Sequence, residues 1–204
     1  MAATAEVLDS GRERPRRRWP VVAGIAVVLL VLGAVRLNAA VRSSEISRLL
    51  TRAASAQDTI ADTDARIAST VTYTQPLLYA AGTAPGTHQS LLQLVQDSAR
   101  AQVAAIRRER TAAAGVHILS WHADATQART RLVAYLDARL RYLQVATENA
   151  DVLFDPHPDL ETAMARTRAA FLRAASAHLD RRVEAVFAGG VYPTVRVGGS
   201  GVSP

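Results

Sequence analysis

The run at residues 19–35, WPVVAGIAVVLLVLGAV, contains seventeen residues without a charged side chain. A bilayer has a hydrocarbon core about 30 Å thick, which takes about 20 predominantly apolar helical residues to cross. The run reaches that length together with residues 37–41, provided that Arg36 extends its guanidinium to the interface. We therefore predict a membrane-spanning signal-anchor helix over residues 19–41.

The residues that flank the run are typical of a membrane interface. Trp19 suits the headgroup region. Pro20 suits a first helical turn, where its missing N–H costs no hydrogen bond. Arg36 follows the run at its other end. We predict that these three residues mark the limits of the anchor.

A compact group of arginines precedes the apolar run, and it predicts the orientation of the chain. The positive-inside tendency keeps such a group in the cytoplasm, and residues 1–18 are then a cytoplasmic N-terminus. Two alternatives compete with an uncleaved anchor: a buried core helix, and a signal peptide cleaved near residues 38–40. An anchor and a cleaved peptide both place the following domain outside the cytoplasm. The arginines that we expect to set this topology are Arg12, Arg14, Arg16, Arg17 and Arg18.

Composition excludes several classes of protein. Aromatic residues make up only 5% of the chain, too few for a β-sandwich or a barrel. The chain has no cysteine, which excludes a disulfide framework, a thiol nucleophile and a cysteine-ligated zinc site. All 24 basic residues are arginine, and 18 of them share the chain after Arg36 with 15 acidic residues. This mixed charge argues against a nucleic-acid partner.

Beyond the apolar run, small and apolar residues recur every seven positions. Two such rows lie three residues apart, which places both on one face of a helix. The pattern predicts that the membrane helix continues without a break to about Ala81, before the turn at residues 82–87. The first row is Ile46, Ala53, Ile60, Ile67 and Thr74, and the second is Leu49, Ala56, Thr63, Thr70 and Leu77.

Three further helices follow from similar stripes. We expect them from Thr87 to about Ala114, from near Ser120 to about Phe154, and from around Pro158 to Ala188. Short connections between long helices favour antiparallel neighbours. The predicted fold is all-α: one transmembrane helix continues into an antiparallel up-down four-helix bundle. The bundle covers residues 42–188, and a flexible Gly/Ser tail covers residues 189–204.

Motifs that carry chemistry are missing from the sequence. It has no G-x-S-x-G nucleophile elbow and no paired Glu-x-x-His motif. His117 and His122 lie five residues apart, which does not place them on one helical face. Together with Asp124 they predict a loop and helix start that pack around Trp121. We expect no catalytic residue, no metal ligand and no cofactor.

These observations predict a single-pass protein of the cell membrane that is not an enzyme. Its extracytoplasmic helical bundle would serve as an interaction or scaffold module. The expected partners are the lipid bilayer and either an envelope or membrane protein or a second copy of the chain. The alternative is an extracytoplasmic domain that binds a small ligand, like a sensor, or catalyses a reaction. The residues expected to be most exposed to a partner are Val133, Val145, Val152, Leu172 and Phe187.

Overall fold

The computed structural model describes residues 19–81, 85–155, 157–176 and 187. Most of these residues are helical, and none of them lies in a strand. The chain divides into two compact units, Met1–Val41 and Arg42–Pro204. The five arginines predicted to set the topology, and the predicted tail at residues 189–204, lie outside the described residues.

The first unit contains the beginning of α1 (Trp19–Ala81). Large apolar side chains from Ile25 to Leu37 are between 55% and 72% exposed, and Arg36 is exposed as well. In the described part of the chain, α1 is the one helix long and apolar enough to cross a membrane. The predicted continuation of this helix to Ala81 is confirmed.

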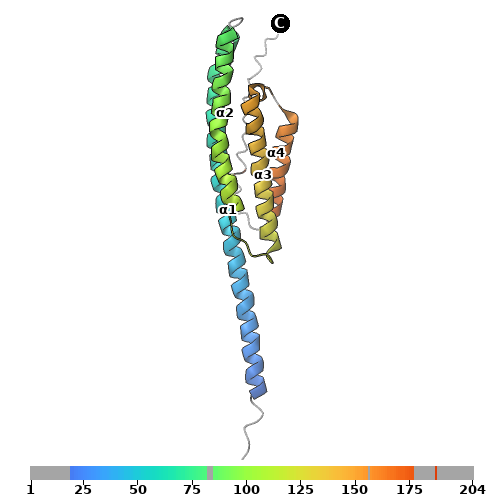
Figure 1. The fold of residues 1–204 in the computed structure, drawn as a ribbon. Helices are drawn as coiled ribbons and strands as arrows, with labels where there is room; N and C mark the ends of the chain where they lie inside the picture. Colours follow the sequence, from blue (N-terminus) through green and yellow to red (C-terminus); the bar gives the residue numbers. More distant parts are fainter. Residues whose placement is uncertain (1–18, 82–84, 156, 177–186, 188–204) are drawn as a thin grey trace, which may run out of the picture. The chain divides into compact units, whose positions relative to one another are not determined.

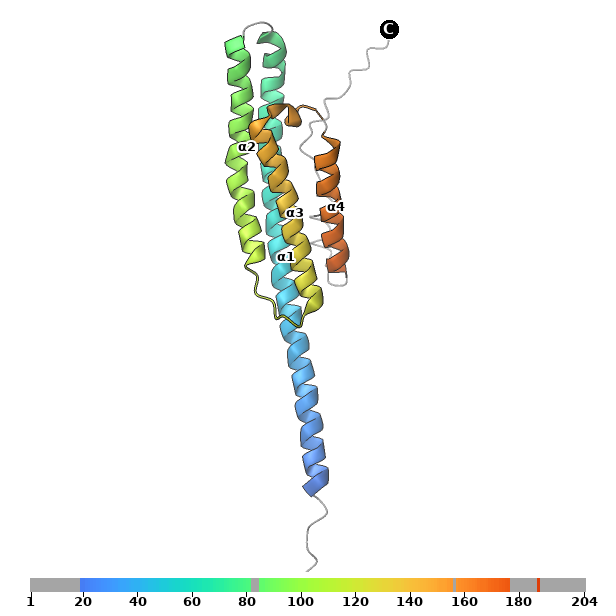
Figure 2. The same cartoon turned by 45° about the vertical axis from the view of Figure 1, so that its right-hand side comes forward.

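The second unit contains the rest of α1 together with α2 (Pro85–Ala114), α3 (Ala123–Glu148), the short 3₁₀ helix η1 (Ala150–Leu153) and α4 (Pro158–Ala175). Helix α3 packs against both α2 and α4, and η1 packs against α3 and α2 (Figures 1 and 2). The largest fully buried side chains in its core include Leu49, Ile67, Ile106, Leu136 and Phe171.

The seven-residue rows of α1 lie on its buried face. All five members of the first row are at most 5% exposed, and the second row is buried from Leu49 to Thr63. Thr70 is half-buried and Leu77 is 38% exposed, so burial fades toward the end of the helix. The threonines on this face donate to carbonyls of their own helix: Thr63 to Thr59 at 2.6 Å, Thr70 to Arg66 at 3.0 Å, and Thr74 to Thr70 at 2.9 Å. The prediction of which face is buried is confirmed.

Among the described residues, the helix limits differ from the predicted ones at three places. The structure gives α4 to Ala175, and the predicted end of this helix at Ala188 lies outside the described residues. Helix α2 begins at Pro85, because proline fits a first helical turn better than it fits the preceding loop. Helix α3 begins only at Ala123, because residues 115–122 form a loop held by side-chain contacts. It ends at Glu148 rather than near Phe154. The predicted starts of α4 at Pro158 and end of α2 at Ala114 are confirmed.

Asn149 causes the early end of α3. Its backbone is extended, with φ −136° and ψ 106°, and its side chain accepts a hydrogen bond from the Asp151 N–H at 3.0 Å. An asparagine side chain that binds the backbone two residues on competes with continued α-helix. The chain therefore restarts as η1, which turns Val152 and Leu153 into the core at 2% and 1% exposure.

Candidate functional site

Glu45 joins α1 to the loop at residues 115–122. Its side chain is 4% exposed, and its Oε1 accepts a hydrogen bond from the Leu119 N–H at 2.9 Å. Its Oε2 lies 2.5 Å from Nδ1 of His122, which is 3% exposed. Beside this pair, the Arg42 Nε donates to Asp124 Oδ2 at 3.0 Å. One buried carboxylate and one exposed ion pair thus fix the start of α3 against the start of the second unit.

The pKa values of the Glu45 and Asp124 carboxyl groups are both lowered. Burial alone would raise the pKa of Glu45, but the hydrogen bonds from His122 and Leu119 and the charges of His122 and His117 outweigh it. Hydrogen bonding by Arg42 lowers the pKa of Asp124. His122 and Asp124 therefore belong to contacts that hold the loop. In the described residues, no group of three or more His, Asp or Glu is placed to hold a metal ion.

Asp64 of α1 and Arg139 of α3 form an ion pair in the core, and each is 2% exposed. Burial lowers the pKa of Arg139 to about 10 and raises that of Tyr142, whose ring lies 5.5 Å from the guanidinium, to about 12. Beyond their own contact, Asp64 Oδ2 and Arg139 Nε have no hydrogen-bond partner among the described residues. The cost of desolvating two charges offsets much of the attraction within a buried pair of this kind, whereas removing one partner leaves an uncompensated charge.

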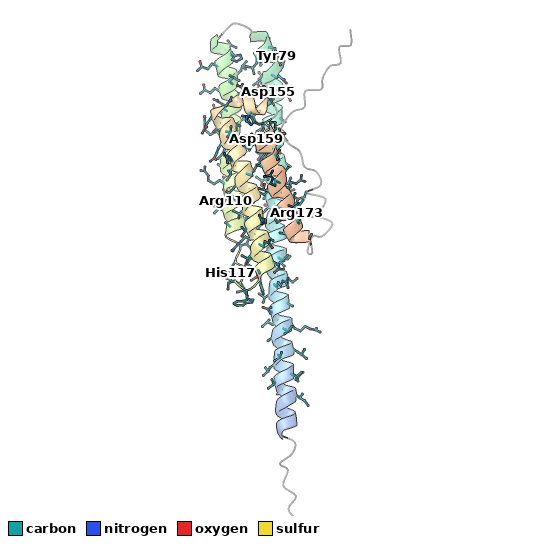
Figure 3. The ribbon with its side chains drawn as sticks, turned by 90° about the vertical axis from the view of Figure 1, so that its right-hand side faces the viewer. Tyr79, Arg110, His117, Asp155, Asp159 and Arg173 are labelled. Carbon is teal, nitrogen blue, oxygen red and sulfur yellow. The ribbon has the colours of Figure 1, made fainter. Side chains whose placement is uncertain are left out.

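A groove of about 600 Å³ lies on the surface of the second unit beside the loop. One wall is α1, and the other is the end of α2 with the first residues of the loop; Figure 3 labels His117 there. The polar side chains of its lining carry basic groups or hydroxyl groups, and none of them carries a carboxylate. The lining residues are Ser47, Arg48, Thr51, Arg52, Ala112, Gly115, Val116 and His117.

The last residues of α1 and the first residues of α2 expose aromatic and apolar side chains. Tyr79, labelled in Figure 3, is 80% exposed, Tyr73 is 64% exposed and Leu94 of α2 is 45% exposed. The Gln96 side chain donates to the carbonyl of Glu148, the last residue of α3, at 3.3 Å. The residues of α2 before Gln96 therefore continue beyond the end of α3. We call this region, residues 73–81 of α1 and 85–94 of α2, the hairpin tip.

The residues predicted to face a partner are less exposed than expected. Val133, Val145 and Leu172 are half-buried and pack against the core. Val152 and Phe187 are each 2% exposed, so their predicted exposure is wrong. The 3₁₀ turn of η1 directs Val152 inward. Phe187 lies 5.5 Å, between ring centroids, from Phe171 and 6.4 Å from Tyr135.

Two aspartates of the second unit have an arginine four residues further along the same helix, and only one of them pairs with it. The pair between Asp62 and Arg66, at the i,i+4 spacing of α1, is present at 3.0 Å on the exposed surface. Asp137 lies at the same spacing from Arg141 on α3. It instead accepts a hydrogen bond from Arg110 of α2 at 2.9 Å, because the packing of α2 on α3 brings a guanidinium from the neighbouring helix within reach.

The buried charged groups are not among the residues predicted from the sequence, although the sequence holds a signal for them. Asp64 lies four residues after Ile60, and Arg139 lies three after Leu136, so each falls on a face assigned to the core. Glu45 directly precedes the first core position, Ile46. A charged residue within an apolar stripe predicts a buried partner on a facing helix, but its identity requires the helix register.

The chain was compared with known proteins of three kinds. No protein-family model, curated protein or solved structure matches it. Its function is therefore argued from the geometry of its own residues.

Proposed function

We propose that the chain is a single-pass membrane protein whose helical region outside the cytoplasm binds another protein by contact. The main support is the exposure of the apolar side chains of the first unit, which is above half from Ile25 to Leu37. So much exposed apolar surface is unfavourable in water. Lipid would cover it, with the backbone hydrogen bonds already satisfied inside the helix.

The orientation follows from the arginines before the apolar run. Five of them lie within residues 12–18, and the next basic residue is Arg36. We infer that the N-terminus is cytoplasmic and that residues 42–188 lie outside. We also propose that the protein lies in the cell membrane.

We further infer that the second unit is an antiparallel up-down four-helix bundle. The order of the contacts between helices supports this. Thr59 of α1 bonds Glu109 of α2 at 3.3 Å, and Thr70 bonds Ser98 at 3.4 Å, so numbers rise on one helix as they fall on the other. The contacts of α2 with α3 run the same way, from Arg110–Asp137 to Gln96–Glu148.

The hairpin tip is the surface that we assign to the partner. Aromatic residues are enriched at protein interfaces because they bury a large area at low cost in conformational entropy. Tyr73 and Leu77 lie four residues apart and share a face of α1, and Leu94 is exposed on the facing helix. The partner would be an envelope or membrane protein, or a second copy of this chain. In this proposal the protein is not an enzyme.

Photocrosslinking from the hairpin tip in living cells tests the proposal. A photoreactive phenylalanine analogue replaces Tyr79 or Tyr73, and the control position is Arg166, an exposed residue of α4. We expect a discrete crosslinked species from the tip and none from the control. Two differently tagged copies distinguish self-association from a second protein. Identical products from tip and control, or no product from a folded protein, would contradict the proposal.

A second candidate function, binding of a small ligand, is favoured by the basic groove beside the loop. Its polar lining and volume suit a compact anionic group. This site is compatible with the first proposal because it lies on different residues from the hairpin tip.

A further inference from the structure

Two arginines on one face of α1 line the groove together. Arg48 and Arg52 are four residues apart, both are exposed, and both are in its wall. Like charges at this spacing repel each other and destabilise a helix. Within the described residues, neither arginine has a carboxylate at salt-bridge distance, whereas Arg42, Arg66, Arg100 and Arg110 each have one. An anion in the groove would remove this repulsion.

The rest of the lining suits an oxyanion. Ser47 carries an exposed hydroxyl, and His117 faces Arg48 and Arg52 from the opposite wall. Thr51 uses its hydroxyl proton on the Ser47 carbonyl at 2.9 Å, so it adds no donor of its own. Guanidinium groups bind phosphate with two parallel hydrogen bonds. Two arginines, one serine hydroxyl and one imidazole form a donor set for a phosphate group.

The position of the groove in the chain points to the source of that phosphate. Arg42 follows directly on Val41, the last residue of the first unit. At a helical rise of about 1.5 Å per residue, Arg48 and Arg52 lie only about 9 Å and 15 Å beyond Arg42 along α1. Long side chains on a helix lean toward its N-terminus, which directs both guanidinium groups toward the start of the second unit.

The loop at residues 115–122 carries a residue typical of membrane interfaces, and this loop lies at the same end of the second unit as the groove. Its contacts with Glu45 and those of Asp124 with Arg42 hold the loop beside the first turn of the second unit. Trp121 in this loop is 66% exposed. Tryptophan is enriched where a protein meets the headgroup layer. The exposed indole and the basic groove therefore share the end of the unit that follows the anchor.

We propose that this groove binds the phosphate headgroup of an anionic phospholipid. The inference rests on the proposed membrane anchor, because a membrane supplies the lipid at high local concentration. Arg48 and Arg52 contact the phosphate, His117 and Ser47 complete its hydrogen bonds, and Trp121 lies in the interface beside it. Binding would hold this end of the second unit at the membrane surface.

Native mass spectrometry of the full chain in detergent tests the proposal with two probes, phosphatidylglycerol and phosphatidylcholine. We expect the wild-type chain to retain more phosphatidylglycerol than phosphatidylcholine. In the double variant Arg48→Gln/Arg52→Gln, phosphatidylglycerol binding should fall about fivefold per arginine, roughly 25-fold in all. The variant Arg48→Lys/Arg52→Lys should keep part of the preference, since lysine retains the charge without the bidentate geometry. The control Arg166→Gln/Arg173→Gln removes the same charge from exposed positions on α4 and should change binding less than about twofold.

The inference would be overturned if the groove variant and the control lost phosphatidylglycerol binding equally, or if the wild type showed no preference for phosphatidylglycerol. Displacement of the lipid by inorganic phosphate would show that the groove takes a free phosphate, and the lipid assignment would be wrong. Carbonate extraction of membranes carrying the wild type separates this inference from the proposed function. A protein that stays in the membrane but shows no lipid preference contradicts the groove alone, whereas a protein extracted by carbonate contradicts the anchor.

Discussion

Glu45 sits where α1, the loop at residues 115–122 and the start of α3 meet, and both of its carboxylate oxygens accept hydrogen bonds. Replacing it with glutamine keeps the shape and removes the charge. Because Glu45 and its partner His122 are buried, we expect Glu45→Gln to lower the free energy of unfolding by about 1–3 kcal/mol. Chemical denaturation of the full chain in detergent measures this loss, with the exposed Glu148→Gln as a control that changes little.

The effect of Glu45 should depend on pH. Its pKa in the folded protein is lowered from an ordinary value of about 4.5, so the folded state favours the charged form. The stability that this charge contributes is present above about pH 4.5 and is lost as the pH falls through the folded pKa. We therefore expect the difference between wild type and Glu45→Gln to shrink below about pH 4.5. A difference that stays constant through acid pH would show that the charge of Glu45 contributes no stability.

The buried pair of Asp64 and Arg139 should show strong coupling. Removing one partner leaves an uncompensated charge in the core, so Asp64→Leu alone and Arg139→Met alone should each cost about 3–5 kcal/mol. The double variant replaces both charges with apolar groups and should cost much less than the sum. Denaturation of the four proteins of this cycle measures the coupling. Additive losses would mean that the two side chains do not form a pair.

At the scale of single residues, helical spacing accounts for several local contacts but for none of the distant ones. The Asp62–Arg66 pair and the back-bonding threonines depend only on helical spacing, and both are present. Glu45 and His122 lie 77 positions apart, and their contact depends on where a loop crosses α1. Hydrophobic periodicity does not contain that information, so the contact between Glu45 and His122 could be found only from the structure.

At the scale of elements, the face of α1 is the prediction most open to a direct test. Ile60 is 3% exposed, whereas the Asp62 side chain is 63% exposed beside Arg66. Ile60→Asp buries an unpaired carboxylate and removes core contacts, so we expect a loss of several kcal/mol. Asp62→Ala should cost less than about 0.5 kcal/mol. Thermal denaturation compares the stability of the two variants. Similar losses would mean that the wrong face of α1 is assigned to the core.

Element boundaries were harder to predict than element faces. The stripe continues past Glu148, and hydrophobic periodicity alone extends α3 to about Phe154. Asn149 ends the helix through a single side-chain hydrogen bond to Asp151. That local competition changes the direction of Val152 and moves it from the predicted surface into the core. A helix-breaking asparagine within an apolar pattern is a signal that could have been weighed.

At the scale of the whole molecule, composition and periodicity predicted the helical class, and a single apolar segment predicted the candidate span. The sequence did not predict the exposed hairpin tip or the basic groove. Both arise from unequal helix lengths and from the path of the loop, which set what packing leaves uncovered. The proposed interaction and lipid sites therefore depend on tertiary arrangement, while the proposed anchor depends on local sequence.

The membrane topology of the full chain is the most direct test of the proposed function. Alkaline phosphatase fused after Pro204 is active only outside the cytoplasm, and a fluorescent protein that fails to mature there serves as the converse reporter. We expect an active phosphatase and a dark fluorescent fusion in a bacterial host. Changing Arg14, Arg16, Arg17 and Arg18 to glutamate should weaken or invert this result. A silent phosphatase on a protein that is made and inserted in the membrane would contradict the proposed orientation.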